Sequence, residues 1–142
     1  MKLSFYIENT NSQPENMEIY GALNNLIEQG KIEDGNLFYN NVDFLPVQPK
    51  FGMFDGAELW YFTGTVVTTS LPNLVRASSS VNKFKIVHLY DRTQKGVNQV
   101  LFSTQHPVIA KTPEDQQEYY RLTGVRANLV EKIEDIVDLG SF

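Results

Sequence analysis

Two segments of this sequence share one pattern: a short apolar run, then Ser or Thr, then Pro, then residues with helical periodicity. The first is TVVTTSLPNLVRASSSV (65–81) and the second is HPVIAKTPEDQQEYYRLTG (106–124). Ser or Thr at an N-cap, with Pro in the first turn, marks a helix that begins directly after a strand. Strands that alternate with helices predict a mainly parallel sheet with helices on its faces.

The rest of the chain continues this alternation. Apolar, β-rich runs predict strands at residues 2–7, 36–44, 65–69, 83–91, 107–111 and 126–131. Apolar residues at helical spacing predict helices over residues 14–29, 71–81 and 113–124. We therefore expect an α/β fold, a three-layer domain with a mainly parallel sheet.

Local signals set the expected boundaries. Ser12 and Glu15 have the spacing of a capping box before the first helix, and Gly30 is a natural stop after it. Five side chains of the second helix are expected to face inward: Leu71, Leu74, Val75, Ser78 and Val81. The other segments are expected to form a long loop at 45–58, a short strand or extended segment at 99–104, and a short helix or tail at 132–142.

Length and composition fit one domain, which we expect to span residues 1–142. The net charge of −5 and the scattered basic residues disfavour binding to nucleic acid or to an anionic membrane. The chain has no cysteine, which excludes disulfides and thiolate chemistry and fits a reducing compartment. No apolar run is long enough for a signal peptide or a membrane span, so we expect a soluble, cytoplasmic protein.

Hydroxyl side chains stand where two strands end and a Pro-containing helix begins: Thr68, Thr69 and Ser70 at the first, Thr112 at the second. Ligands of parallel sheets bind beyond such carboxyl ends, and free N–H groups of a helix N-terminus attract anions. Acidic residues follow Thr112 and would repel an anion, which favours the first of the two ends. The same hydroxyls are also ordinary N-caps, so a ligand site and a structural role both stay open.

Catalytic and metal-binding signals are sparse. His88 ends an apolar strand with Asp91 three residues later, a spacing that allows a general base oriented by a carboxylate if the strand turns at Tyr90. The alternative is a buried histidine with satisfied hydrogen bonds. His106 is the second of two histidines and lies far from the first, so we expect no metal site. Phosphate-binding glycine motifs are missing, and we expect no cofactor.

The segment PKFGMFDGAELWYF (49–62) concentrates aromatic residues in one glycine-containing stretch. Such a segment serves as a lid, as a ligand wall or as a subunit contact. As a subunit contact, it would use Phe51, Phe54, Trp60 and Tyr61 as the interface. The alternative is a loop that folds over the sheet and ties down its edge with buried aromatic rings.

Two segments resemble a known family. GTVVTTSLPNLVRASSSVNKFKIVHLYD (64–91) and HPVIAKTPEDQQEYYRLTGVRANLVEKIED (106–135) resemble successive units of the N-terminal Rossmann-like half of GT-B glycosyltransferases, a likeness that covers roughly residues 62–135. The resemblance implies a Rossmann-like domain. The family's glycine-rich turn after the first strand has no counterpart in ENTNSQPEN (8–16). Its donor site lies mainly in a second half, which would begin where this sequence stops.

Three functions follow from these patterns. The first is a Rossmann-like module without catalysis of its own that binds a sugar, a nucleotide or a partner chain at the strand carboxyl ends. The second is a non-catalytic homo-oligomeric interaction protein that uses the aromatic segment 49–62. The third is a small hydrolase or transferase built on His88 and Asp91. We favour the first and expect no enzyme activity from the isolated chain.

Overall fold

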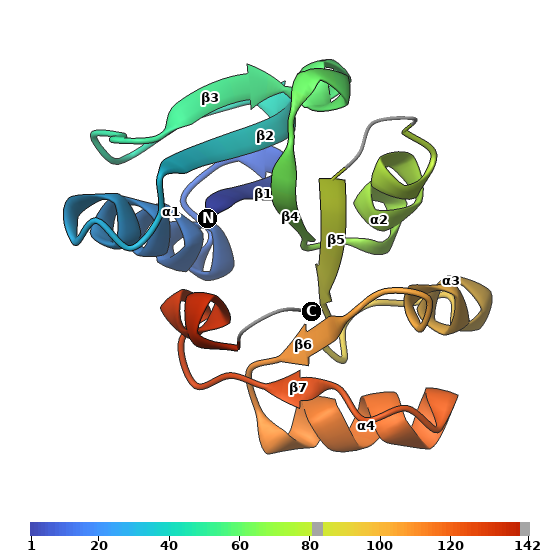
Figure 1. Cartoon of the computed structure of the whole chain (residues 1–142). Coiled ribbons are helices and arrows are strands. Elements are labelled where there is room, and N and C mark those ends of the chain that lie inside the picture. Colours follow the sequence, from blue (N-terminus) through green and yellow to red (C-terminus); the bar gives the residue numbers. More distant parts are fainter. Residues whose placement is uncertain (81–83, 140–142) are drawn as a thin grey trace.

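One sheet of seven strands runs through residues 1–80 and 84–139, which the computed structural model describes (Figure 1). Every pair of neighbouring strands is parallel. The strands are β1 (Lys2–Thr10), β2 (Asp34–Val42), β3 (Gly52–Asp55), β4 (Gly64–Thr68), β5 (Phe84–Leu89), β6 (Val108–Ala110) and β7 (Asn128–Leu129). Their order across the sheet is β3-β2-β1-β4-β5-β6-β7.

Helices cover both faces of this sheet. They are α1 (Pro14–Glu28), α2 (Leu71–Ser78), α3 (Val97–Ser103), α4 (Pro113–Thr123) and two 3-10 helices, η1 (Gly56–Tyr61) and η2 (Ile133–Asp138). One buried cluster joins α1 and η2 to one face of the sheet. A second cluster joins η1, α2, α3 and α4 to the other face. The expected three-layer, Rossmann-like α/β fold is confirmed.

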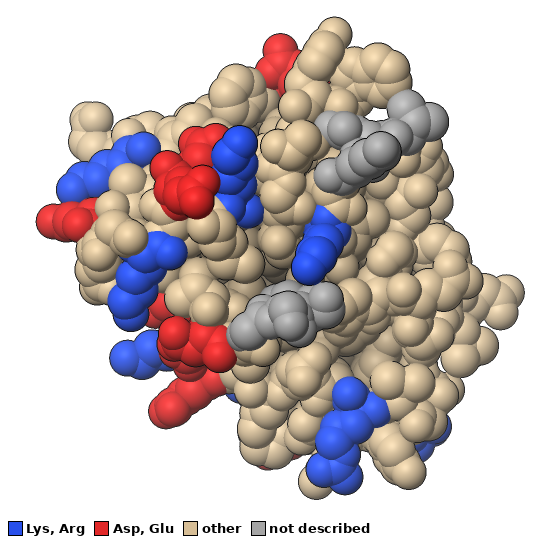
Figure 2. All heavy atoms as spheres, viewed as in Figure 1, with Lys and Arg blue, Asp and Glu red and all other residues tan. Residues whose placement is uncertain are grey.

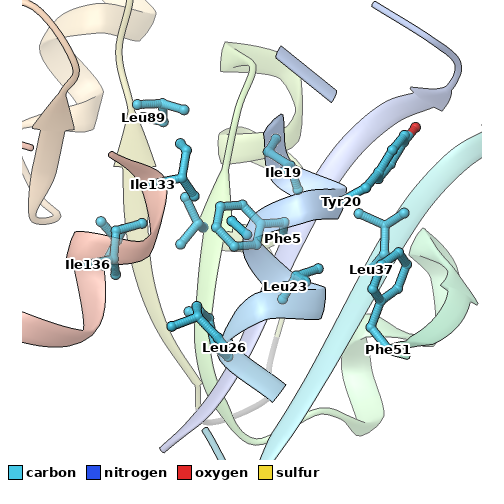
Figure 3. Packing of buried hydrophobic residues seen from close by; sticks show 14 of the residues in the cluster. Phe5, Ile19, Tyr20, Leu23, Leu26, Leu37, Phe51, Leu89, Ile133 and Ile136 are labelled. Atoms are coloured by element: carbon cyan, nitrogen blue, oxygen red, sulfur yellow. The ribbon is translucent and has the colours of Figure 1, made fainter. Parts of the chain in front are cut away.

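The central strand β1 is buried on both sides, which explains its apolar sequence. Phe5 and Ile7 point into the cluster beneath α1, whereas Tyr6 points toward α2. Figure 3 shows Phe5 packed against α1, with Ile133 and Ile136 of η2 beside it. The two faces therefore have separate cores that meet at β1.

The strand order reverses at β1. The chain moves from β1 outward to β2 and β3, then returns to β4 on the other side of β1 and continues outward to β7. Because crossovers between parallel strands are right-handed, this reversal puts α1 and α2 on opposite faces of the sheet. The switch point of the sheet, where ligands of such folds bind, thus lies between β1 and β4.

The expected loop at 45–58 is correct only for residues 45–51, because residues 52–55 form the edge strand β3 and residues 56–58 belong to η1. Phe51 is buried and stacks on Tyr20 of α1, and Asn24 of α1 bonds the backbone of Gln48 and Lys50. These contacts hold the segment beside β2, where a four-residue strand pairs on one side only. Pro and Gly around it gave the pattern of a loop.

The expected strand or extended segment at 99–104 is also wrong, because most of it belongs to helix α3. No side chain caps its start, and Gly96 precedes it with φ 108. The hydroxyl of Ser103 is buried and bonds the Tyr119 hydroxyl of α4 at 2.7 Å. The helical conformation of α3 therefore depends on contacts with α4, and such contacts cannot be read from the local sequence.

Two details of the predicted helices differ as well. The N-cap of α1 is Gln13, and no side chain caps it, so the capping box of Ser12 and Glu15 does not form. In α2, Val75 is 39% exposed, and Asn73 and Ala77 are buried instead. Asn73 is drawn inward by hydrogen bonds, as described below. The predicted inward position of Val81 lies outside the described residues.

Candidate functional site

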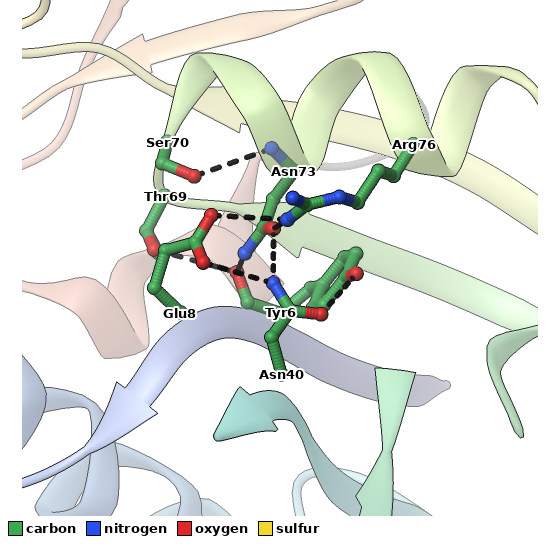
Figure 4. Close-up of polar contacts among 7 residues, drawn as sticks. All are labelled: Tyr6, Glu8, Asn40, Thr69, Ser70, Asn73 and Arg76. Carbon is green, nitrogen blue, oxygen red and sulfur yellow. Dashed lines mark hydrogen bonds and ion pairs between the residues drawn. The ribbon is translucent and has the colours of Figure 1, made fainter. Parts of the chain in front are cut away.

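Five polar side chains from three elements meet on the α2 face of the sheet, near the switch point (Figure 4). Tyr6 and Glu8 come from β1, Asn40 from β2, and Asn73 and Arg76 from α2. Tyr6 and Glu8 are two residues apart in a strand and so share a face, and Asn73 and Arg76 are three apart in a helix. We call these five residues the polar cluster.

Hydrogen bonds connect every member of the polar cluster. The Tyr6 hydroxyl donates to Asn40 Oδ1 at 2.7 Å. The Asn40 amide donates to Asn73 Oδ1 at 2.8 Å and to Glu8 Oε2 at 3.0 Å. Arg76 Nη1 donates to Asn73 Oδ1 at 3.0 Å and to Glu8 Oε1 at 3.1 Å. Burial raises the pKa of Tyr6, an effect that Arg76 and Asn40 oppose, so this phenol is a neutral donor near pH 7.

A hollow of ≈ 360 Å³ opens beside the polar cluster, between η1 and α2. Tyr6, Arg76 and Trp60 of η1, which is 53% exposed, are among its lining residues. Gly56 brings η1 close to the sheet, since a Cβ there would lie 2.7 Å from the Tyr6 hydroxyl. We refer to this hollow as the η1–α2 groove.

Arg76 is only partly committed to the polar cluster. Its ion pair with Glu8 joins two half-exposed side chains and contributes little to stability. Its hydrogen bonds to Glu8 and Asn73 both come from Nη1, and a guanidinium carries five N–H donors, so this side chain, which is 53% exposed, has further donors to offer a ligand.

The predicted residues Thr68 and His88 lie side by side in the core. The Thr68 hydroxyl is 2.9 Å from His88 Nδ1, and His88 Nε2 is 2.8 Å from Gln94 Oε1. The Gln94 amide donates to the carbonyls of Thr69 and Leu89, so its oxygen must accept from the imidazole. His88 is therefore neutral and protonated on Nε2, and Thr68 donates to Nδ1. Burial lowers the pKa of His88 to about 4.

The structure does not join His88 to Asp91. The Asp91 carboxylate accepts instead from the backbone N–H of Thr93 at 2.7 Å and from the hydroxyl of the same residue. His88 is fully buried, and both of its ring nitrogens have partners. The pair thus lacks the shared hydrogen bond and the open access that a general base needs.

The remaining predicted hydroxyls act as caps and braces. Ser70 accepts from the N–H of Asn73 at 3.3 Å, and Thr112 accepts from the N–H of Asp115 at 3.1 Å. Thr69 donates to the Tyr6 carbonyl at 3.3 Å, and Asn73 donates to the same carbonyl at 3.2 Å. Thr69 and Ser70 thus bond the backbone of two members of the polar cluster, Tyr6 and Asn73. Thr112 instead caps α4.

The β1–α1 turn, which holds phosphate in many dinucleotide-binding folds, is filled by its own side chains. Tyr20 and Asn16 bond back to the turn at Asn11, and Asn11 Oδ1 accepts from the N–H of Gln13. Burial raises the pKa of Glu15 in the first turn of α1, and Asp91 adds to this effect. A carboxylate in this position disfavours a phosphate.

The predicted interface residues separate into two groups. Phe51 is buried in the core beneath α1, where it stacks on Tyr20. Phe54, Trp60 and Tyr61 are exposed by 39%, 53% and 80%. One ring of the segment 49–62 therefore ties it down, and three remain accessible; a role of these three as an interface or ligand wall stays a prediction.

Charges on the visible surface are mixed. Figure 2 shows acidic and basic side chains interspersed over the α1 side of the face that it displays. Within residues 1–80 and 84–139, no three His, Asp or Glu side chains are grouped in a way that could hold a metal ion. No helix in this same part of the chain combines the length and the apolar character needed to cross a membrane.

No protein-family model, curated protein or solved structure matches this chain. Its function is therefore inferred from its own geometry. Sequence patterns had pointed to Thr69 and Ser70, next to the polar cluster, but they missed Tyr6, Asn40 and Arg76. These three come from separate elements and have no informative spacing in the sequence.

Proposed function

We propose that this chain binds a hydroxyl-rich small molecule of the sugar class in the η1–α2 groove. One observation carries the proposal: an exposed aromatic residue, Trp60, lines the same hollow as Tyr6 and Arg76. Sugars present apolar C–H faces with hydroxyls around the rim. They therefore suit a site that combines an aromatic surface with a few fixed polar groups.

The site is preorganised for such a ligand. The hollow of ≈ 360 Å³ falls within the usual size range of small-molecule sites. Asn40 and Glu8 hold the Tyr6 hydroxyl and the Arg76 guanidinium in place through the bonds of the polar cluster. Binding to a site that is already ordered costs less conformational entropy.

The resemblance to the N-terminal half of GT-B glycosyltransferases supports the same ligand class, since that half would bind the sugar acceptor. A nucleotide is less well supported, because the β1–α1 turn is filled by side chains and carries Glu15. The relationship to glycosyltransferases and the cytoplasmic location both stay predictions. The proposal is for binding, and it assigns no reaction to the chain.

The single tryptophan makes this proposal easy to test, because Trp60 lies in the groove itself. We would follow its fluorescence while titrating monosaccharides, disaccharides, sugar phosphates and nucleotide sugars. The expected result is a saturable change in emission and reduced quenching by iodide with at least one sugar. Arg76→Ala should weaken that affinity about 10- to 100-fold, as expected for a lost hydrogen bond to a charged group.

Arg126→Ala is the matched control, because Arg126 is exposed at the far side of the molecule, after α4. It should leave the affinity unchanged. Tyr6→Phe, which removes only a hydroxyl, should weaken binding less than Arg76→Ala does. An emission that stays constant over the whole panel, or an equal loss in Arg126→Ala, would rule out the groove as a sugar site.

A second candidate function is self-association through the edge of the sheet beside η1. It is favoured by the exposure of Phe54 and Tyr61 next to the short edge strand β3. Sedimentation velocity over a range of concentrations would then show a dimer that Tyr61→Ala dissociates. Tyr120→Ala, at an exposed tyrosine of α4, should have no effect. A monomer at every concentration would exclude this candidate.

A further inference from the structure

A second hollow lies on the other side of η1 and has a different chemistry. Its volume is ≈ 380 Å³, and four of its lining residues are aromatic: Phe38, Phe54, Tyr61 and Phe62. Leu59 anchors η1 in the core, so consecutive residues of this helix line different hollows, Trp60 the η1–α2 groove and Tyr61 the second one. We call the second hollow the aromatic hollow.

The rings of the aromatic hollow surround Phe38, which lies at its base and is nearly buried. The centroid of Phe54 is 5.7 Å from that of Phe38, with 33° between the ring planes. The centroid of Phe62 is also 5.7 Å away, with an angle of 65°. The rings that line this hollow therefore differ in orientation, and each of them has a π face that a cation can approach.

Negative charge borders these rings. Asp34, at the start of β2, and Glu58, in η1, complete the lining together with Asn36, whose amide donates to Asp34 at 3.3 Å. No Lys or Arg is among the lining residues of this hollow in the described part of the chain. Lys2 is the Cα partner of Asp34 in the β1–β2 register, yet the ion pairs formed by described residues do not join them.

We propose that the aromatic hollow binds the alkylammonium group of a small organic cation. Aromatic faces attract cations through the ring quadrupole, most strongly when several rings share one cation. The negative carboxylates of Asp34 and Glu58, at the rim of the hollow, also attract a cation. The two carboxylates disfavour an anion, and they give a cation an advantage over a neutral ligand of the same shape. A hollow of ≈ 380 Å³ has the size of a small-molecule site.

Choline and its neutral carbon isostere, in which a tert-butyl group replaces the trimethylammonium, form a matched pair of probes. We would titrate each into the protein and record amide and side-chain NMR shifts together with calorimetry. Choline is expected to bind with shifts centred on Phe54, Glu58 and Tyr61, whereas the isostere should bind at least several-fold more weakly. Equal affinities would show a merely apolar site and overturn the proposal, as would the lack of binding by choline.

Four exposed positions supply the variants. Tyr61→Ala and Glu58→Gln should each weaken choline binding about 3- to 30-fold, the range expected for a lost cation–π or ionic contact. Tyr120→Ala and Glu131→Gln remove an exposed ring and an exposed carboxylate elsewhere and should change nothing. An effect of the same size in the control variants would overturn the proposal. Unchanged melting temperatures would show that all four variants fold.

This inference is independent of the proposed sugar site. Arg76 lines the η1–α2 groove and not the aromatic hollow, so Arg76→Ala should leave choline binding intact. A loss of choline binding in Arg76→Ala would contradict the separate location of the two sites. Failure of every sugar to bind would leave the test with choline unaffected.

Discussion

The imidazole of His88 has a partner at each ring nitrogen, Thr68 on one side and Gln94 on the other. The sequence placed this histidine at the end of an apolar strand, and from that position both a catalytic and a buried structural role were open. Gln94 favours the structural role, because its amide donates to two carbonyls and its oxygen therefore accepts from Nε2 of His88. A residue six positions downstream in a turn carries no sequence signal for this contact.

The neutral state of His88 makes stability depend on pH. Its pKa is about 4 in the folded protein, below the ordinary value of 6.5, so the unfolded chain binds more protons between these values. Its contribution is therefore complete above pH 6.5 and is lost as pH falls from 6.5 to about 4. The loss amounts to about 3 kcal/mol at most.

Urea unfolding between pH 7.5 and roughly pH 4.5 would measure this dependence. The free energy of unfolding of the natural chain should fall more steeply with pH than that of His88→Gln. His106, whose pKa burial also lowers, and Glu15, whose pKa burial raises, are present in both proteins and cancel in the comparison. Parallel pH profiles of the two proteins would contradict the assignment.

At the scale of elements, the sequence predicted those whose ends carry a local signal. Ser70 and Thr112 cap α2 and α4 as expected, and Gly124 ends α4 with φ 74. Sequence reasoning missed η1, although the Asp55 side chain caps its start. It also missed β3 and α3, which have no such signal at their start. Their conformations depend on contacts with α1 and α4, which are distant in the chain.

The start of β4 requires a glycine. Gly64 has φ 129, and a Cβ there would lie 2.6 Å from the Lys2 carbonyl of β1. Gly64→Ala should therefore lower the free energy of unfolding by more than about 1 kcal/mol. Chemical denaturation followed by circular dichroism would measure the change, and an unchanged midpoint would argue against this close approach.

Gly21→Ala provides the opposite control. Gly21 lies within α1, and no atom comes within 4 Å of a Cβ built there. The substitution should raise the free energy of unfolding by about 0.5–1 kcal/mol, since alanine has the higher helix propensity. A loss of stability in both variants would show a general intolerance of alanine instead of a local clash.

For the whole molecule, the segment after β7 completes the layer formed by α1. Ile133 and Ile136 of η2 are fully buried in the cluster beneath α1, although β7 follows a helix on the opposite face. The two segments α1 and η2, far apart in the sequence, thus pack on the same core on one face of the sheet. The sequence predicted a short helix or tail here, and only the fold shows that it covers the sheet.

Removing part of this cover should destabilise the entire fold. Ile136→Ala is expected to lower the free energy of unfolding by about 2–4 kcal/mol, the usual cost of truncating a buried isoleucine. Val125→Ala, at a side chain that is 44% exposed, should change it by less than about 0.5 kcal/mol. Urea titrations of both variants provide the measurement. Equal stability of the two would indicate that η2 is not part of the core.

The candidate site is likewise a property of the whole sheet. The reversal of strand order at β1 brings Asn40 of β2 and Arg76 of α2 onto the two sides of Tyr6. Parallel pairing and a switch point were predicted from the alternation of strands and helices. Which polar side chains meet there depends on strand order and register, and neither can be obtained from local sequence patterns.

The central position of β1 also has a consequence for how the chain folds. Its two partners, β2 and β4, follow it in the chain and are separated from each other by β3 and η1. During synthesis, β1 can pair with β2 early, but its other edge stays open until β4 has emerged, roughly one to four seconds later at ordinary elongation rates. That edge is formed by Leu3, Ser4, Phe5 and Tyr6. We expect a nascent chain in this interval to expose an unpaired strand edge, and the pairing of β4 with β1 to protect that edge from aggregation.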